Sequence, residues 1–354
     1  MTNDIWILGA TGRTGRDVAA RLDREGVDLV LAGRSRSTLD ALAGELGGRP
    51  RVSVGSLDEN LRRLAQDPPR VVVNTVGPFA TTSRQVSEAL PDGTHYVDIS
   101  NEFSGFEDVF GLDERAKRKG QTLVKGAGYG VMGTEAAILR LCEGRPRPAR
   151  VRVDSLPTLA LAAGPLGAAL AGSVVEVIRF GGREVRGGSL VRSATASHPR
   201  TIVTPEGDSL FTGGGASGDL FAAWRASGAE AVVAASMAAP SNPVVRRVIL
   251  PILGVLIRIP GAPAFLSGRI AKIKLKEGSM ARTATWGHAE AEWPDGTTSE
   301  AWLRTGDAGV FTADVFAEVA LRLLRGEGKP GAFTPGALFG ADLAEAAGAT
   351  ITLV

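Results

Sequence analysis

Short apolar runs alternate with amphipathic stretches through the first 125 residues of the chain. Six strands are predicted, at about 4–8, 28–33, 51–54, 71–74, 96–99 and 122–124, and the fourth of them is apolar enough for a buried parallel strand. Between them, apolar positions at helical spacing predict helices, among them about 37–47, 81–90 and 111–119. Strands alternating with helices form parallel sheets covered on both faces. The sequence therefore predicts an α/β fold built on a Rossmann-type, doubly wound parallel sheet.

The pattern changes after about residue 130. Strand-like alternation and glycines become frequent, as in Val151-Arg152-Val153 and Gly213-Gly214-Gly215. We therefore expect a first domain at 1–130 and an α+β domain, for substrate binding or oligomerisation, at 131–310. Residues 311–354 are expected to return to the first domain. A chain of 354 residues is long enough for two such domains.

A glycine-rich loop follows the first strand, at Gly9-Ala10-Thr11-Gly12-Arg13-Thr14-Gly15. Glycines let the backbone turn tightly and approach a pyrophosphate, which the N–H groups of the next helix then hold. The spacing is not the usual dinucleotide fingerprint, but the preceding strand and the following helix give it the right context. We predict phosphate binding by Gly9, Thr11, Gly12, Arg13, Thr14 and Gly15. A glycine loop without a ligand is the alternative.

The end of the second strand indicates which dinucleotide is bound. NAD-binding proteins usually place a carboxylate there for the ribose hydroxyls, whereas this chain has Gly33-Arg34-Ser35-Arg36. Guanidinium forks suit a phosphate. We therefore predict NADP(H), with its 2′-phosphate bound by Arg34, Ser35 and Arg36. Arg34 at the strand end is the stronger candidate. Arg36 could instead be a solvent-exposed charge in a loop that binds no ligand.

One segment, 244–276, combines an apolar run with basic flanks. Residues 249–257 are almost wholly apolar, and of the seven Arg and Lys residues that flank them two precede the run and five follow it. The run is much shorter than the ~20 residues that span a bilayer. A buried helix or a homodimer contact is one interpretation. The others are a lid over a lipophilic substrate and a surface for an anionic partner, such as a peripheral membrane contact or an acyl carrier protein.

Composition excludes several classes of function. The 40 basic residues face 38 acidic ones, so nothing favours nucleic acid as a partner. A single cysteine, Cys142, allows no intrachain disulfide and favours a reducing, cytoplasmic location. The first strand begins at once, so we expect no signal peptide before it. The three histidines are far apart in sequence, and we predict no metal site.

Four blocks in order resemble the saccharopine dehydrogenase-like oxidoreductases. They are 9–15, Asn74-Thr75-Val76-Gly77-Pro78-Phe79, Tyr96-Val97-Asp98-Ile99-Ser100-Asn101-Glu102 and Gly126-Ala127-Gly128-Tyr129-Gly130. The likeness continues into Gly218-Asp219-Leu220 and 334–340, so it spans most of the chain. Within the family, the chain looks most like the group that includes trans-acting enoyl reductases. It looks less like the enzymes of lysine metabolism.

The resemblance implies a nicotinamide-dependent reductase of a C=N bond or an activated C=C bond. Asn74, Thr75, Val76, Gly77 and Pro78 would line the nicotinamide ribose. The 98–102 loop would lie at the carboxyl edge of the sheet, where open α/β sheets bind ligands. The chain departs from its relatives at Gly130-Val131-Met132-Gly133, where they often carry Asp-Ser-x-Pro or Val-Val-Pro. We therefore infer no substrate contacts from this loop.

Two related mechanisms do not fit the sequence. Short-chain dehydrogenases need a Tyr with a Lys four residues later, but neither Tyr96 nor Tyr129 has one. Semialdehyde dehydrogenases need a nucleophilic cysteine, and Cys142 lies in an apolar helical pattern typical of a buried residue.

The mechanism that remains is hydride transfer from the cofactor to a small substrate, in which the protein orients the two reactants and supplies a proton donor. The candidates for catalysis are Tyr129, Asp98 and Glu102, or a water that they hold. Instead of taking part in catalysis, Asp98 could cap a turn or a helix, and Tyr129 could pack through its ring. Because no acid–base pair is evident, a dinucleotide-binding sensor or scaffold without turnover is the alternative function.

Overall fold

The computed structural model describes residues 4–354 except 159–163, 166–174, 176, 260 and 276–281. The chain divides into two compact units. Unit 1 holds the residues up to 100 together with 104–132 and 309–348, and unit 2 holds 101–103, 133–308 and 349–354. The last residues thus depart from the expected return to the first domain, because β18 (Thr350–Leu353) pairs with β16 (Thr298–Thr305) of unit 2.

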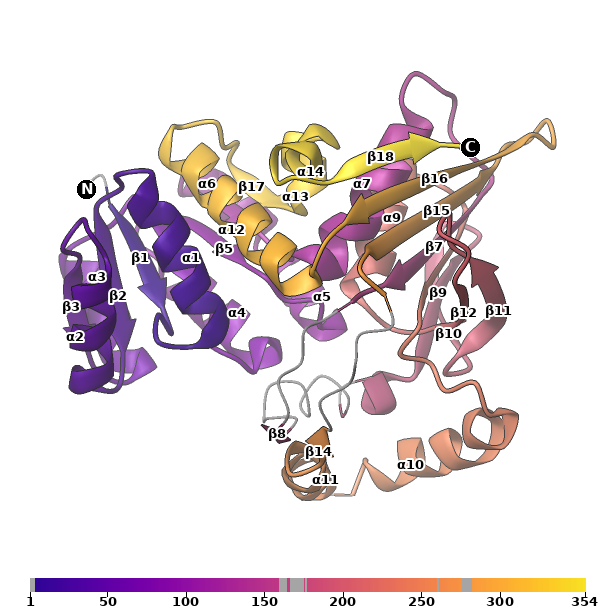
Figure 1. Cartoon of the computed structure of the whole chain (residues 1–354), viewed down its shortest axis with the longest axis horizontal. Coiled ribbons are helices and arrows are strands. Elements are labelled where there is room, and N and C mark those ends of the chain that lie inside the picture. Colours follow the sequence, from indigo (N-terminus) through magenta and orange to yellow (C-terminus); the bar gives the residue numbers. More distant parts are fainter. Residues whose placement is uncertain (1–3, 159–163, 166–174, 176, 260, 276–281) are drawn as a thin grey trace. The chain divides into compact units, whose positions relative to one another are not determined.

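Unit 1 contains a seven-stranded parallel sheet in the order β17-β6-β5-β4-β1-β2-β3 (Figure 1). Its strands are β1 (Ile5–Leu8), β2 (Leu29–Gly33), β3 (Arg51–Val54), β4 (Val71–Asn74), β5 (His95–Asp98), β6 (Thr122–Val124) and β17 (Gly331–Phe333). The first six match the predicted runs. The strand order reverses between β1 and β4, so the sheet is doubly wound and has a switch point there.

The first helix of unit 1 buries one apolar stripe against the sheet. In α1, Val18, Ala19 and Leu22 are buried at helical spacing. The helices lying wholly or mainly in this unit are α1 (Arg13–Arg24), α2 (Arg36–Glu45), α3 (Leu57–Gln66), α4 (Phe79–Ala89), α5 (Phe103–Phe110), α6 (Asp113–Arg118), α12 (Ala308–Leu324), α13 (Pro335–Phe339) and α14 (Asp342–Ala346).

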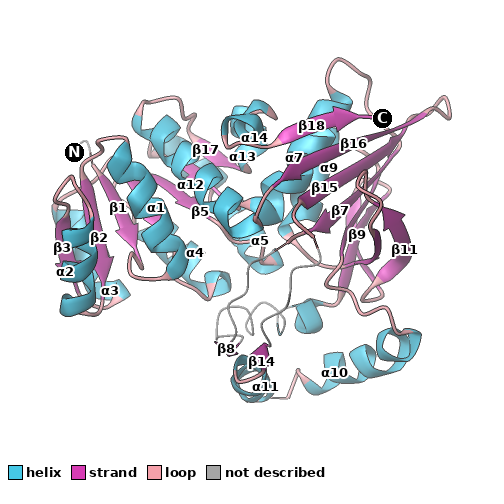
Figure 2. Ribbon diagram, viewed as in Figure 1, coloured by secondary structure: helices cyan, strands magenta, loops and turns pink. Residues whose placement is uncertain are grey.

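Unit 2 is built on a nine-stranded mixed sheet, drawn in magenta in Figure 2. The order is β10-β9-β13-β7-β15-β16-β18, and β12 joins β13 to β11. Its remaining strands are β7 (Arg150–Leu156), β9 (Gly182–Arg186), β10 (Ser189–Ser193), β11 (Ser197–Val203), β12 (Ser209–Gly214), β13 (Ala231–Ser236) and β15 (Thr285–Glu292). This is the α+β organisation that the sequence predicts.

In unit 2, described residues 177–180 are helical, and further helical segments lie wholly or mainly in the described part of that unit. They are α7 (Tyr129–Cys142), α9 (Gly218–Ser227), the π-helical turn η1 (Val245–Ile249), α10 (Leu250–Leu256) and α11 (Ala262–Ala271). A two-stranded pair, β8 (Gly164–Pro165) with β14 (Lys274–Leu275), lies outside the large sheet. Within the described ranges, no helix has the length and apolar content that a bilayer crossing requires.

His95 gives the sheet of unit 1 a measurable pH dependence. Its Nδ1 accepts a hydrogen bond from the Thr122 backbone N–H at 3.0 Å, which requires that this nitrogen be unprotonated. Burial, helped by the charge of Arg70, lowers the pKa of His95 to about 4. A folded-state pKa below the unfolded value gives stability that is present above pH ~6.5 and is lost as the pH falls towards 4.

We therefore expect the free energy of unfolding to fall between pH ~7 and pH ~4.5 in both the wild type and His95→Gln. The fall should be about 2–3 kcal/mol larger in the wild type. Gln keeps a hydrogen-bond acceptor but does not titrate. Urea unfolding at several pH values measures the difference, and the subtraction removes the contribution of the carboxylates. Parallel pH profiles for the two proteins would show that His95 does not carry the effect.

Candidate functional site

The candidate site lies at the carboxyl ends of β1, β2, β4, β5 and β6 in unit 1. Because these strands are parallel and adjacent, the segments that follow them meet at one edge of the sheet. The glycine loop follows β1 and the Asn74–Pro78 loop follows β4, so these two flank the switch point. The predicted phosphate-binding and ribose-lining residues are therefore neighbours.

The three glycines of the loop have three different roles. Gly9 has a φ of 78°, a left-handed conformation that favours glycine, and it starts the turn. A Cβ on Gly15 would lie 2.5 Å from the Gly9 carbonyl oxygen, so α1 packs closely on the loop. Gly12 is exposed, and its φ of −68° is open to any residue. Neither the backbone conformation of Gly12 nor its burial demands a glycine, so its predicted role in phosphate binding stays a prediction.

Helix α1 begins directly after Gly12, and no side chain caps its first turn. Its backbone N–H groups and the positive end of its dipole form the kind of anion site that binds pyrophosphate. The first turn contains no acidic residue, and Arg13 is exposed there beside the half-buried Thr14. The predicted phosphate-binding residues thus surround one helix N-terminus.

The end of β2 presents two arginines in different situations. Arg34 is exposed, and within the described ranges no hydrogen bond or ion pair engages its guanidinium. Arg36 is the first residue of α2, and its guanidinium lies 3.6 Å from the Asp40 carboxylate one helical turn later. The Ser35 and Ser37 hydroxyls lie 3.3 Å apart. Arg34 is therefore the better placed of the two for a phosphate ligand.

The Asn74–Pro78 loop is held against the glycine loop by side-chain hydrogen bonds. The Thr75 hydroxyl donates to the carbonyl oxygens of Leu8 and Gly9, at 2.8 and 3.0 Å. The Asn74 amide oxygen accepts from the Val76 N–H at 3.0 Å, and the Gly77–Pro78 bond is cis. These contacts fix the two loops in one arrangement.

Asp98 is the centre of a buried polar network. Its Oδ2 accepts from the Ser83 hydroxyl at 2.6 Å, the Tyr96 hydroxyl at 2.7 Å and the Lys125 ammonium at 2.9 Å. Its Oδ1 accepts from the backbone N–H groups of Ser100 and Gly126, at 3.0 and 3.2 Å. The five donors occupy the acceptor directions of a carboxylate. The geometry therefore favours a positioning role for Asp98, which ties together the loops after β5 and β6.

Lys125 is the partner that sequence reasoning missed. Its side chain is fully buried, donates to Ser83 at 2.7 Å, and lies over the rings of Phe79 and Phe106 at 5.8 and 5.5 Å. A charged residue directly after the apolar strand 122–124 was the available signal. Burial of a lysine requires a charge partner, and Asp98 supplies it.

Tyr96 belongs to the same network. Burial, together with the nearby charge of Asp98, holds the pKa of its phenol well above the ordinary value. Its hydroxyl donates to Asp98 and accepts from the Asn74 amide at 3.1 Å. The network thus extends across β4, β5 and β6 and fixes the edge of the sheet.

The two other predicted catalytic residues lie in different units. Tyr129 belongs to unit 1 and is the first residue of α7, with its backbone N–H donating to the Thr312 hydroxyl at 3.1 Å. Its side chain is largely buried. Glu102 belongs to unit 2 and is also buried. The structure does not test their catalytic roles, which stay predictions.

In unit 2, Asn101 brings two of the resembling blocks together. Its amide donates to the Asp219 carboxylate at 3.0 Å, and its backbone carbonyl accepts from the Gly218 N–H at the same distance. The Thr134 hydroxyl donates to Asp219 at 2.7 Å. Burial raises the pKa of Asp219 to about 6, although these hydrogen bonds oppose the rise. The start of α9 is thereby joined to the segment that follows β5.

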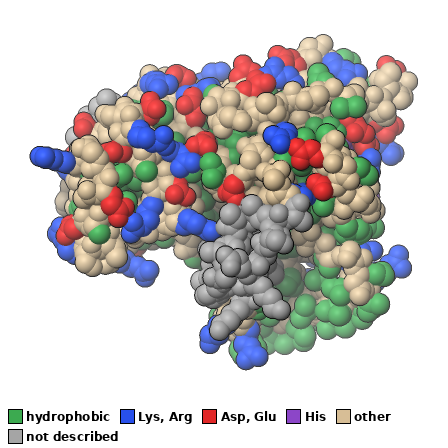
Figure 3. Space-filling model, in the orientation of Figure 1, with side chains coloured by type: hydrophobic (Ala, Val, Ile, Leu, Met, Phe, Trp, Pro, Cys, Tyr) green, Lys and Arg blue, Asp and Glu red, His purple; other side chains and the backbone are tan. Residues whose placement is uncertain are grey.

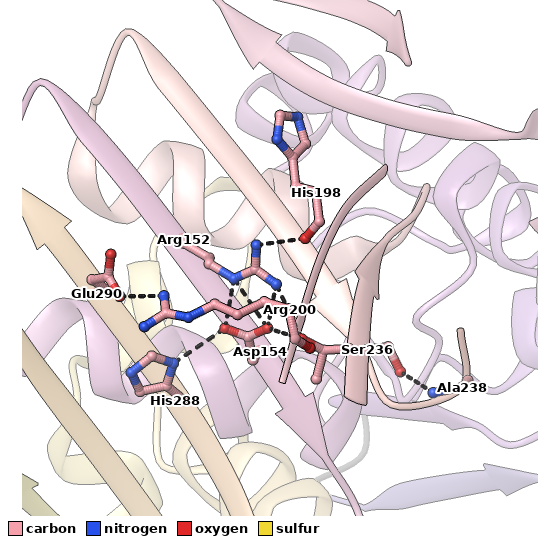
Figure 4. Close-up of polar contacts among 9 residues, drawn as sticks. Arg152, Asp154, His198, Arg200, Ser236, Ala238, His288 and Glu290 are labelled. Carbon is pink, nitrogen blue, oxygen red and sulfur yellow. Dashed lines mark hydrogen bonds and ion pairs between the residues drawn. The ribbon is translucent and has the colours of Figure 1, made fainter. Parts of the chain in front are cut away.

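A second charged cluster occupies one face of the sheet in unit 2 (Figure 4). Asp154 on β7 binds the Arg152 guanidinium at 2.9 Å, the Thr212 hydroxyl at 2.6 Å and His288 Nδ1 at 3.1 Å. Burial alone would raise the pKa of Asp154, but the bonds from His288 and Arg152 outweigh it and hold the pKa well below its usual range. The cluster is thus held by a buried carboxylate.

The same face brings together groups that could hold a metal ion. His288, Glu290 and Glu300 offer ligand atoms that all lie within 4.8 Å of one another. Sequence spacing gave no sign of this, because β15 and β16 bring them together. Arg200 pairs with Glu290, so a guanidinium already balances that carboxylate. His288 Nε2 lies 3.4 Å from the Glu300 carboxylate, and the absence of a metal site stays a prediction.

Cys142, at the end of α7, is a free and partly buried thiol. Burial raises its pKa to about 11, against the opposing charge of Arg145. A thiol with this pKa is a poor nucleophile at neutral pH.

Comparison with solved structures identifies the class of fold. Over 99% of both chains, the structure is similar to a saccharopine dehydrogenase (L-Glu forming) from Saccharomyces cerevisiae, with a TM-score of 0.59 and 12% identity. At this identity the similarity shows the fold, a Rossmann-type unit with a second mixed-sheet unit. No family model and no curated protein sequence matches the chain.

Two further structures match about a third of the chain. One is an alternative dihydrofolate reductase from Brucella canis complexed with NADP, with 16% identity over 34% of this chain and 70% of that one, and a TM-score of 0.29. The other is a yeast methylglyoxal/isovaleraldehyde reductase complexed with NADPH, with 13% identity over 34% and 53% and a TM-score of 0.28. These scores are too low to support an argument about the whole chain.

Proposed function

We propose that the chain is an NADP(H)-dependent oxidoreductase. The observation that carries the proposal is that Arg34, whose guanidinium no described residue engages, follows β2 at the same edge of the sheet as the uncapped N-terminus of α1. A carboxylate at that strand end would repel a 2′-phosphate, whereas an arginine attracts it. The residues at this edge therefore fit a phosphorylated dinucleotide.

We further propose that it reduces a polarised C=C or C=N bond of a small, lipophilic substrate of the enoyl or imine type, free or carried on an acyl carrier protein. The resembling blocks support this, since they follow β1, β4, β5 and β6 at the edge where the cofactor would bind. When bound, the cofactor supplies a hydride. The Asp98–Lys125 network holds the surrounding loops in place, which is the positioning that hydride transfer requires.

Tyr129 is the proposed proton donor, because the acceptor directions of Asp98 are occupied and Glu102 lies in unit 2. Tyr129→Phe is expected to lower kcat by at least tenfold, and by ~10²–10⁴-fold if proton transfer limits the rate. The affinity for NADPH should not change, since the phenol is not among the predicted dinucleotide contacts. NADPH oxidation with enoyl thioesters and cyclic imines measures the rate.

Tyr96→Phe serves as the contrasting variant. It removes a buried hydroxyl bonded to Asp98, so it should lower stability more than Tyr129→Phe does. An unchanged kcat in Tyr129→Phe would eliminate that residue as the proton source. The remaining sources would then be Glu102 or a bound water.

A second function, binding without turnover, is favoured by one observation: Asp98 accepts five hydrogen bonds inside a buried network, which suits a structural carboxylate better than one that exchanges a proton with substrate. In that case the protein would act as a redox sensor or scaffold. Tight NADPH binding with no oxidation across both substrate panels would support this function over the reductase.

A further inference from the structure

The segment 244–273 carries an exposed apolar face. Nine of the fourteen exposed large hydrophobic side chains among the described residues lie in it: Val244, Val248, Ile249, Ile252, Val255, Leu256, Ile259, Phe265 and Ile273. Their exposed fractions run from 43% at Ile249 to 71% at Phe265. Figure 3 shows hydrophobic side chains, in green, gathered over α10. An apolar surface of this extent marks an interaction site.

The exposed side chains share one side of the helical run η1–α10. Val248, Ile252 and Val255 follow one another at spacings of four and three residues, which places them on one face. Ile257, which falls on the opposite side, is buried. The segment is therefore attached to unit 2 along one side and presents apolar groups on the other.

Other contacts attach the segment to its own unit. The Arg246 guanidinium lies 4.8 Å from the Phe211 ring and donates to the Pro240 carbonyl at 3.1 Å. The Arg246 side chain thus holds the segment on unit 2, and a substitution of Arg246 would disturb the position of the segment. Among the described residues, no ion pair or hydrogen bond engages the exposed side chains of Arg247, Arg258, Arg269 and Lys272.

The charge of the segment indicates what covers this face. No acidic residue occurs from Ala231 to Lys276, whereas seven Arg and Lys residues occur between Val244 and Lys276. A second copy of the chain would bring the same positive charge against itself. Apolar side chains flanked by Arg and Lys fit an anionic phospholipid surface. The apolar side chains enter among the acyl chains, and the anionic headgroups attract the Arg and Lys side chains.

We propose that the segment 244–273 binds anionic membrane surfaces peripherally, with the exposed face of η1–α10 and Phe265 entering the interface. This proposal is independent of the proposed cofactor and reaction. Co-sedimentation with phosphatidylglycerol/phosphatidylcholine vesicles should give a partition coefficient at least tenfold higher than with phosphatidylcholine alone. Raising NaCl from 0.1 to 1 M should remove most of that difference, because the electrostatic part is screened.

Two sets of variants test the apolar and the charged parts separately. Ile252→Asp/Val255→Asp should lower the partition coefficient at least tenfold, and Arg247→Glu/Lys272→Glu should do the same. All four side chains are exposed, so the fold should be retained, and urea unfolding checks this. Val203→Asp on β11 is the matched control, because Val203 is 58% exposed but lies outside the segment.

Three results would overturn the proposal. One is the absence of vesicle binding. Another is vesicle binding that Arg247→Glu/Lys272→Glu abolishes but Ile252→Asp/Val255→Asp leaves unchanged, which indicates that the apolar face does not enter the interface. The third is a wild-type dimer that dissociates in Ile252→Asp/Val255→Asp without any vesicle binding, which indicates a second copy.

Discussion

Lys125→Met is expected to lower the free energy of unfolding of unit 1 by about 3–5 kcal/mol. The substitution keeps most of the side-chain volume but removes the buried ammonium. Asp98 and Ser83 then lose a donor in a region without solvent, and the carboxylate charge is left uncompensated. The cost of the uncompensated charge exceeds that of the lost hydrogen bonds. Urea unfolding measures the loss.

Lys119→Met is the matched control. Its ammonium pairs with Asp92, whose side chain is 75% exposed, so the expected loss is below about 1 kcal/mol. In the double variant Lys125→Met/Asp98→Asn, the loss should be smaller than the sum of the two single losses, since removing both charges leaves neither unpaired. A loss in Lys125→Met no larger than that in Lys119→Met would refute the role assigned to the network.

Gly12→Val should weaken NADPH binding by at least about 100-fold while changing the free energy of unfolding by less than about 1 kcal/mol. Gly12 is exposed and its extended backbone accepts a side chain, although the new Cβ would lie 3.3 Å from the Gly9 carbonyl oxygen. A branched side chain there occupies the space that a pyrophosphate needs next to the helix N-terminus. Calorimetric titration measures the affinity.

Gly44→Val in α2 is the control, because a Cβ added to Gly44 would have no other atom within 4 Å. It introduces the same residue into unit 1 away from the glycine loop, and NADPH binding should be unaffected. Gly15→Val should behave differently from both, because its Cβ would collide with the Gly9 backbone and destabilise the unit. Full NADPH affinity in Gly12→Val would place the dinucleotide elsewhere.

The fold of unit 1 could be predicted because it is encoded locally. Strands β1, β2, β4 and β6 are short, mainly apolar runs, β3 and β5 mix polar and apolar residues, and the glycine loop follows β1. β17 was not predicted, since Gly331-Ala332-Phe333 has only three residues and joins β6 from more than 200 residues away. β18 was expected in the first domain but joins unit 2, because its pairing with β16 is decided by tertiary contacts.

The part of the candidate site that could be predicted from sequence consists of residues at the ends of the predicted strands. Asn74, Asp98 and Arg34 each stand at a strand end, so their shared edge follows from parallel pairing. What could not be predicted is which side chains satisfy one another in the interior. Lys125 lies 27 residues from Asp98 in sequence, and His288 lies 134 residues from Asp154. Only the folded chain brings these pairs within hydrogen-bonding distance.

The central claim is that a 2′-phosphorylated dinucleotide binds unit 1 with Arg34 at its phosphate. Calorimetric titration of the wild type, Arg34→Asp and Arg36→Asp with NADPH and NADH tests it most directly. We expect the wild type to bind NADPH at least tenfold more tightly than NADH, Arg34→Asp to lose or reverse that preference, and Arg36→Asp to change it less, since Arg36 already pairs with Asp40. Equal affinity for the two dinucleotides in the wild type, or an unchanged preference in Arg34→Asp, would contradict the account.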